Sequence, residues 1–463
     1  MKKIITLLCA CCMLCDGFAQ QTTLFSVDAF IEQVRLNHPV AKQSNILVEK
    51  AAAALLSSRG GFDPVLTLDA SRKTFDGKNY YFYTNPELKI PTWIGVDVKA
   101  GLESNGGQYL NPEVTAGNTS YLGLEVPLAK GLLMDKRRAA LQQAKIFRDQ
   151  SEQERLQTVN DLLFDAYISY WQWAGSYSLY ALYNKFFTVA TDRFRLVKIA
   201  FVNGDRSAMD TLEAYTQLQM FELLQTDAVM KLNDASFDLS NYLWQANDSA
   251  YILPEGYVPD TIRFAENLEQ QTMEVLLNTA ATQNPALRSY NYKLDALNVE
   301  RKLKFQSLLP VLNAKANLLN KDYNVFKGVN ALFFENNYKW GIDFKLPLFL
   351  RDGSGEYRQA KLKIEETNYA LSAKRWEVEN KIRSYYNQFT QLQTQLQTMQ
   401  NTFNNYNTLL RQEDLRFRNG ESSLFLVNSR ENKLIEAAQK LVELRVKYQK
   451  AYYAVQWAGG LLR

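Results

Sequence analysis

The sequence contains four cysteines, and all of them lie within the first fifteen residues. Residues 1–20 follow the pattern of a secretory signal peptide, with a basic start, an apolar core over 4–14, and small or polar residues up to Gln20. Cleavage near Gln20 leaves a chain without thiols, which excludes disulfide bonds and thiol catalysis. An alternative is lipidation at Cys11, because residues 8–11 resemble a lipoprotein cleavage box.

The sequence also has little of what catalysis requires. The only histidine, His38, directly precedes Pro39 at a junction between two predicted helices, which argues against a histidine-based zinc site and against Ser-His catalysis. No phosphate-binding loop of the Walker type is present. A net charge of +4, spread evenly over 463 residues, indicates no nucleic-acid surface. We therefore expect neither an enzyme nor a cofactor or metal site.

Long hydrophobic runs are missing after the leader, and prolines are missing from two long segments. A transmembrane helix takes about 20 apolar residues, and no stretch after the leader reaches that length without charges. No proline occurs between Pro127 and Pro254 or after Pro347, so helices can continue unbroken there. The segments 135–201 and 352–418 would each form about 100 Å of helix at 1.5 Å per residue.

An internal duplication organises the chain. Four anchors recur in the same order at offsets between 216 and 246 residues: Pro39 with Pro285, Pro64 with Pro310, Pro127 with Pro347, and Gly204 with Gly420. Each copy is predicted to consist of helix, strand, loop, strand, long helix, turn and helix. The predicted boundaries are 21–244 for the first repeat, 245–267 for a linker, and 268–463 for the second repeat.

Period-two alternation predicts two strands in each repeat. They lie at about 64–74, 119–127, 310–320 and 337–347, and their polar sides include Lys315, Asp343 and Lys345. A soluble sandwich would alternate in the same way, but four strands cannot build a sandwich core. In an exported chain they can form one sector of a membrane barrel, which needs partner chains because an open edge does not persist in hydrocarbon.

The first repeat carries 26 extra residues between its strands, within 75–118. Val96, Val98 and Ala100 alternate with polar residues there, which predicts an extra hairpin at the extracellular rim. A plug or a receptor site is the alternative interpretation of this long loop.

The helical parts are predicted to form hairpins over about 135–244 and 352–458. The last helix has heptad spacing, which is typical of a coiled-coil seam, at Val427, Glu431, Leu434, Ala438, Leu441, Arg445, Tyr448, Tyr452 and Val455. Each long helix ends at Asn-Gly, where glycine suits the left-handed conformation that stops a helix. Ser207 and Ser422 are candidates for capping the helices that follow.

The order and spacing of these motifs resemble those of the TolC-like outer-membrane efflux proteins. The matching segments are Phe25-Ser26 through Asn37-His38-Pro39, Asn284-Pro285-Ala286-Leu287, the Val-Pro-Leu and Leu-Pro-Leu strand ends, and the Phe-x-Asn-Gly turns. The resemblance implies a mainly α fold with a membrane β-barrel sector. It implies a homotrimer in outer-membrane lipid, with a 12-stranded barrel and a periplasmic helical tunnel. Its partners would be a periplasmic adaptor and an inner-membrane transporter, in drug efflux, metal efflux or type I secretion.

The resemblance also assigns candidate site residues. The periplasmic turns, with Gly204, Asp205, Gly420 and Glu421, would contact the adaptor, and Asp210 would be an acidic gate residue. The polar strand residues Lys315, Asp343 and Lys345 would face the lumen. The second repeat departs from the family pattern, because Leu426 and Ser429 stand where acids are expected. The alternative function is an exported soluble coiled-coil scaffold or adhesin without a pore.

Overall fold

The computed structural model describes residues 23–323 and 337–463. The predicted signal peptide, with all four cysteines, therefore lies outside the described residues. The chain forms two compact units, and each takes segments from both repeats. The helical unit comprises residues up to 45, 156–284 and 376–463, and the sheet unit comprises 46–155 and 285–375.

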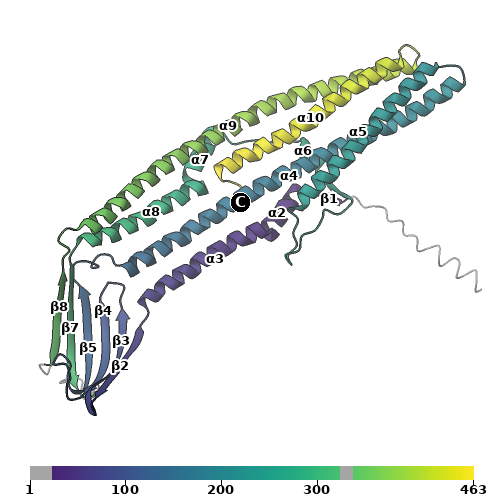
Figure 1. Cartoon of the computed structure of the whole chain (residues 1–463). Helices are drawn as coiled ribbons and strands as arrows, with labels where there is room; N and C mark the ends of the chain where they lie inside the picture. Colours follow the sequence, from purple (N-terminus) through teal and green to yellow (C-terminus); the bar gives the residue numbers. More distant parts are fainter. Residues whose placement is uncertain (1–22, 324–336) are drawn as a thin grey trace, which may run out of the picture. The chain divides into compact units, whose positions relative to one another are not determined.

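The helical unit is built from two helical hairpins and a group of short elements (Figure 1). One hairpin joins α4 (Lys136–Val202) to α5 (Ala208–Ser240), and the other joins α9 (Arg351–Arg418) to α10 (Leu424–Gly459). The short elements are β1 (Thr23–Phe25), α2 (Val27–Asn37), β6 (Tyr257–Pro259), α6 (Thr261–Ala265) and α7 (Met273–Gln283). Strand β1 pairs with β6 in parallel.

Aromatic packing holds the short elements against α4. Trp171 and Trp173 are fully buried, and the Trp171 ring stacks on Phe264 at a centroid distance of 5.9 Å. The Tyr170 hydroxyl donates to the Phe25 carbonyl at 2.6 Å. Residues 245–267, which we expected to be a linker, therefore contain β6 and α6 and contribute Phe264 to the core.

Equivalent elements from the first helix to the first strand of each repeat have equal lengths. Helices α2 and α7 have 11 residues each, and α3 (Pro39–Arg59) and α8 (Pro285–Phe305) have 21 each. A single 3-10 turn follows in both repeats, η1 (Gly60–Phe62) and η2 (Gln306–Leu308). The first strands, β2 (Val65–Phe75) and β7 (Val311–Lys321), have 11 residues each.

The sheet unit contains one antiparallel sheet of six strands in the order β2-β3-β4-β5-β7-β8, which lie side by side in Figure 1. The remaining strands are β3 (Lys78–Pro91), β4 (Asp97–Gly106), β5 (Gly117–Pro127) and β8 (Tyr338–Lys345). Strand β5 of the first repeat pairs with β7 of the second, so the two repeats share one sheet.

The expectation of four strands was wrong for the first repeat, because β3 and β4 also belong to the sheet. Pro86 argues against a strand, since it has no N–H to donate. In the structure the ladder between β3 and β4 is interrupted at Asn85 and Pro86. On either side of the interruption, Thr84 pairs with Ser104 and Glu87 pairs with Gly101.

The expected position of the extra hairpin, at the extracellular rim, was also wrong. The turn between β3 and β4 lies at the end of the sheet where α4 begins, because the Arg138 guanidinium donates to the Ile94 carbonyl at 3.4 Å. The turn between β2 and β3, at Asp76 and Gly77, lies at the opposite end. The hairpin thus spans the full height of the sheet.

Among the helices of the described residues, none is both long enough and apolar enough to cross a bilayer.

Candidate functional site

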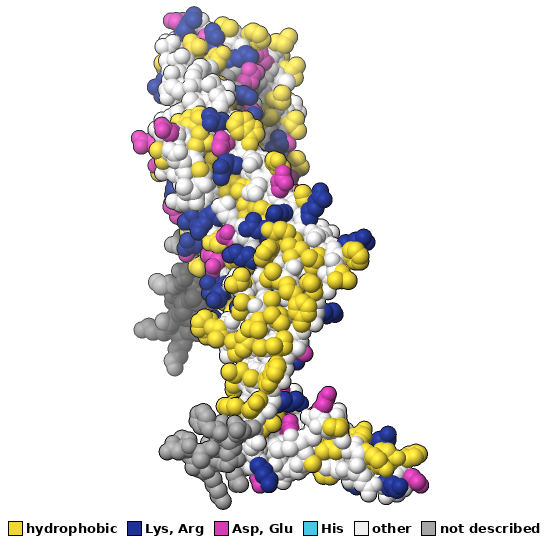
Figure 2. Space-filling model, turned by 90° about the vertical axis from the view of Figure 1, so that its left-hand side faces the viewer, with side chains coloured by type: hydrophobic (Ala, Val, Ile, Leu, Met, Phe, Trp, Pro, Cys, Tyr) yellow, Lys and Arg dark blue, Asp and Glu magenta, His cyan; other side chains and the backbone are white. Residues whose placement is uncertain are grey.

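The sheet has one apolar face. Residues that follow one another across the strands in register, such as Leu66, Leu88, Ala100 and Leu122, all lie on it. In the second repeat this face continues with Leu312, Ala314, Ala316, Leu318, Tyr338, Trp340, Ile342 and Phe344. Many of these side chains are exposed, Trp340 by 67% and Phe344 by 64%. Figure 2 shows hydrophobic side chains gathered in a broad patch over the strands.

The opposite face is polar and carries ion pairs between neighbouring strands. Lys315 on β7 lies 2.6 Å from Asp343 on β8, and Lys345 is on the same face as Asp343, two residues further along β8. Lys99 on β4 likewise lies 2.8 Å from Glu125 on β5. The three residues predicted for the polar side of the second repeat therefore share one face of the sheet.

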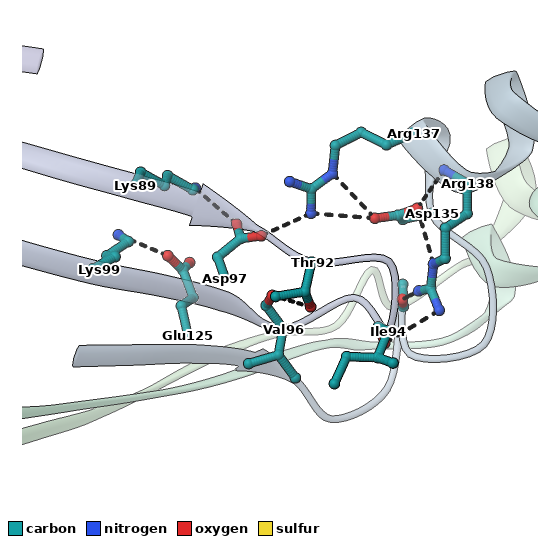
Figure 3. Close-up of polar contacts among 11 residues, drawn as sticks. Lys89, Thr92, Ile94, Val96, Asp97, Lys99, Glu125, Asp135, Arg137 and Arg138 are labelled. Atoms are coloured by element: carbon teal, nitrogen blue, oxygen red, sulfur yellow. Dashed lines mark hydrogen bonds and ion pairs between the residues drawn. The ribbon is translucent and has the colours of Figure 1, made fainter. Parts of the chain in front are cut away.

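The helix end of the sheet is tied to the start of α4 by a charged cluster (Figure 3). Asp135 accepts from the Arg138 backbone N–H at 2.8 Å, which caps the helix. Arg137 reaches from α4 to Asp97 at the start of β4 at 2.9 Å, and Lys89 on β3 lies 2.9 Å from the same carboxylate. This cluster was not predicted, and its only signal in the sequence was the run Asp135 to Arg138.

The first helical turn has the backbone geometry that its glycine predicted. Gly204 has φ +79°, and its N–H donates to Phe201 while that of Asp205 donates to Ala200, which is a Schellman motif. Ser207 then caps α5, and Asp210 completes a capping box by accepting from the Ser207 backbone N–H at 3.1 Å. Asp210, the predicted gate residue, therefore has a structural role.

The second helical turn repeats the Schellman motif at Gly420, with φ +80°, and Glu421. The prediction that Ser422 caps the next helix was wrong. Ser423 is the cap of α10, while the Ser422 hydroxyl donates to Glu413 at 2.5 Å. Leu426 occupies the position that Asp210 has in the first turn, so no carboxylate is available there for a capping box.

On the helices that border the turns, a buried ion pair connects the two hairpins. Arg193 on α4 donates two hydrogen bonds to Glu431 on α10, at 2.8 and 3.0 Å, and only 1% of the Glu431 side chain is exposed. Asn428 on α10 donates to Glu213 on α5 at 3.2 Å. Sequence analysis did not predict this cluster, although a glutamate within the apolar seam of α10 was a signal for it.

Comparison by sequence finds one family that is similar to part of the chain. Residues 276–460, most of the second repeat, match the family model described as outer membrane efflux protein. The predicted resemblance to this family is confirmed for these residues. No match was found among curated proteins.

Solved structures extend the likeness to both repeats. The CmeC outer-membrane channel of Campylobacter jejuni has 16% identity and a TM-score of 0.63, and covers 94% of this chain and 85% of its own. The outer membrane protein VceC of Vibrio cholerae has 15% identity and a TM-score of 0.62, over 94% and 95%. The open-state MtrE channel of Neisseria gonorrhoeae has 13% identity and a TM-score of 0.65, over 94% and 89%. At these identities the likeness establishes the fold.

Family and fold together favour one of the two predicted functions. An outer-membrane efflux channel protomer fits both, whereas a soluble coiled-coil scaffold or adhesin fits neither the family model nor a sheet with one apolar face.

Proposed function

We propose that three copies of this chain close a β-barrel in the outer membrane and form a passive export duct. The observation that carries this proposal is the two-faced sheet with two open edges. Strands β2 and β8 are exposed along their whole length or nearly so, and their outward backbone groups have no partner strand among the described residues. In hydrocarbon such edges must be paired.

The direction of the edge strands suits closure by further copies. With six antiparallel strands, the first and the last run in opposite directions, so β8 of one copy can pair antiparallel with β2 of the next. In the closed barrel the apolar face would contact lipid, and the polar face, with Lys315, Asp343 and Lys345, would line the lumen.

We further propose that the two helical turns contact a periplasmic adaptor, which would couple the duct to an inner-membrane transporter. Gly204, Asp205, Gly420 and Glu421 are all exposed. Both turns have the same Schellman geometry, which supports their use as one repeated contact. Each of the two sequence repeats, 21–244 and 268–463, would supply one of these turns.

Asp210 is proposed as a residue of the pore gate in addition to its role in the capping box. Asp210→Asn separates the two roles, because asparagine keeps an acceptor for the Ser207 N–H and loses the charge. We expect lower cation selectivity in planar bilayers with an unchanged amount of trimer. Unchanged selectivity and conductance would remove Asp210 from the gate.

The duct itself is tested by extraction and native mass measurement. The protein should remain with outer membranes until detergent is added and should then have the mass of three chains. Release in the absence of detergent, or a mass of one chain only, would contradict the proposal.

A further inference from the structure

We infer that the hairpin of β3 and β4 is part of the barrel wall, so that a trimer of this chain forms a barrel of 18 strands. The inference rests on the proposed trimer and adds the number of strands and the width of the passage. It also replaces the 12-stranded barrel that the resemblance implied. With six strands in each chain, 12 strands would need either two copies or a hairpin that leaves the sheet.

The first argument is the continuous register of the sheet. Leu66 on β2 pairs with Leu88 on β3, Leu88 with Ala100 on β4, and Ala100 with Leu122 on β5. This apolar row crosses the extra hairpin without changing face. A hairpin that stood apart from the wall would have no reason to match the lipid-facing pattern of β2 and β5.

The second argument is the packing on the polar face, which joins the hairpin to β5. The Tyr121 side chain on β5 crosses over Gly101 on β4, and its hydroxyl donates to Glu87 on β3 at 2.5 Å. A Cβ at position 101 would lie 2.4 Å from the Tyr121 ring, so this close approach requires glycine. The Thr119 hydroxyl on β5 also donates to Glu103 on β4, at 3.0 Å.

The third argument is the length and the anchoring of the hairpin. Strands β3 and β4 have 14 and 10 residues, and a membrane strand needs about 9–11. Their turn is held at the helix end by the Asp97–Arg137 ion pair and by Arg138 (Figure 3). Both strands therefore cross the whole sheet.

The additional strands widen the passage. Strands about 4.8 Å apart and tilted by about 40° give a backbone diameter of about 24 Å for 12 strands and about 36 Å for 18. The cross-section enclosed by the backbone is then about twofold larger. Barrels of 16–18 strands leave an aqueous channel, so the outer-membrane section would admit bulkier cargo than a 12-stranded barrel.

Cysteine pairs test which strand lies beside β2 in the assembled protein. The sequence has no cysteine after residue 15, so introduced pairs can be read without background. Thr67→Cys with Glu87→Cys joins β2 to β3, which are paired in the 18-stranded wall. Thr67→Cys with Tyr121→Cys would join β2 to β5, which become neighbours only when the hairpin leaves the wall. Asn313→Cys with Asp343→Cys, on β7 and β8, is the control that forms in either case.

We expect the first pair and the control to form disulfides in outer membranes, and the second pair to stay reduced. A disulfide between positions 67 and 121, or none between 67 and 87 while the control forms, would overturn the inference. Native mass separates this result from the proposed function, because a trimer with the 67–121 disulfide retains the duct and loses only the wider wall. A dimer with the 67–87 disulfide would be a 12-stranded barrel and would contradict both.

A deletion tests the width. Removing residues 78–112 keeps the turn at Asp76 and Gly77 and places residue 113 opposite Phe75. This joins β2 directly to β5 and keeps the alignment that these two strands have in the six-stranded sheet, where Thr67 and Tyr121 lie in one row. The test adds polyethylene glycol to the barrel side of planar bilayers. The shortened trimer should exclude polymers that are small enough to enter the full-length trimer. An unchanged exclusion size would overturn the inference. Where the shortened chain fails to assemble, the cysteine pairs decide.

Discussion

The two repeats follow the same order of elements, but they differ in their strands and in the caps of their helical turns. The first inserts a hairpin between its strands and closes its helical turn with a capping box, whereas the second has two strands among its described residues and a single serine cap. The Schellman geometry of both turns is nevertheless the same. The backbone of the turns is thus the same in the two repeats, whereas their strands and their side-chain caps differ.

The largest expected effect concerns the edge strands, one from each repeat. Leu68→Arg on β2 and Ile342→Arg on β8 place a charge on the apolar face, at a cost of roughly 2 to 4 kcal/mol near the bilayer midplane. We expect a similar loss of trimer from both, measured by electrophoresis of outer membranes without heating.

The matched controls lie on the polar face of the same strands. Asp69→Arg and Gly341→Arg should assemble normally, and a side chain at Gly341 meets open space. Loss of trimer from Ile342→Arg but not from Leu68→Arg would show that only the second repeat contacts lipid.

The turn glycines should respond alike in the two repeats. Valine at Gly204 or Gly420 would have to adopt positive φ, which costs roughly 1 to 2 kcal/mol, although there is space for its side chain. We expect faster hydrogen exchange at the turn and loss of export, with a normal amount of trimer.

Asparagine at either glycine should retain more export, since it tolerates the left-handed region. Gly355→Val is the helical control, because Gly355 has ordinary φ and open space around it. Wild-type export in both valine variants would contradict the role of the turns.

The caps should respond unequally. Ser207→Ala removes two side-chain hydrogen bonds, one accepted from the Asp210 N–H and one donated to the Asp210 carboxylate, whereas Ser423→Ala removes one, and a lost cap costs about 1 kcal/mol. The start of α5 should therefore lose more protection from hydrogen exchange than the start of α10. Leu426→Asp, at a half-exposed position, should create the missing box and slow exchange there. Equal effects of the two serine changes would mean that the additional hydrogen bond from the Ser207 hydroxyl to Asp210 adds nothing.

The smallest expected effect lies at the junctions between the first two helices of each repeat. His38 stacks on Tyr242, and burial lowers its pKa although a backbone hydrogen bond at Asn241 opposes the shift. Its counterpart Asn284 is buried and donates to the Ala458 carbonyl at 3.1 Å.

A lowered histidine pKa means that the unfolded chain binds the proton more tightly, so stability should fall as the pH drops below about 6.5. His38→Asn should reduce this loss, measured by thermal unfolding in detergent between pH 7 and pH 5. An identical pH dependence in the variant would show that His38 does not contribute.

Local patterns in the sequence predicted much of this protein. The bounds that alternation predicted for β2, β5, β7 and β8 lie within two residues of the observed ones, and the Asn-Gly pairs located both turns. Strand β3 was missed because Pro86 and Pro91 interrupt the pattern of a strand, whereas the alternation of Val96, Val98 and Ala100 indicated the hairpin that contains β4. Ser422 was chosen over Ser423 because adjacent serines look alike until the turn fixes which one precedes the helix.

The sequence by itself therefore determined most of the elements and the resemblance to a family, because helix length, strand alternation and glycine turns are properties of neighbouring residues. Only the tertiary structure decided that the inserted hairpin joins the sheet, that Asp210 caps a helix, and that Arg193 pairs with Glu431. These features depend on groups that are far apart in the chain, or on the direction in which a side chain points once the turn has formed, and neither is fixed until the backbone has folded.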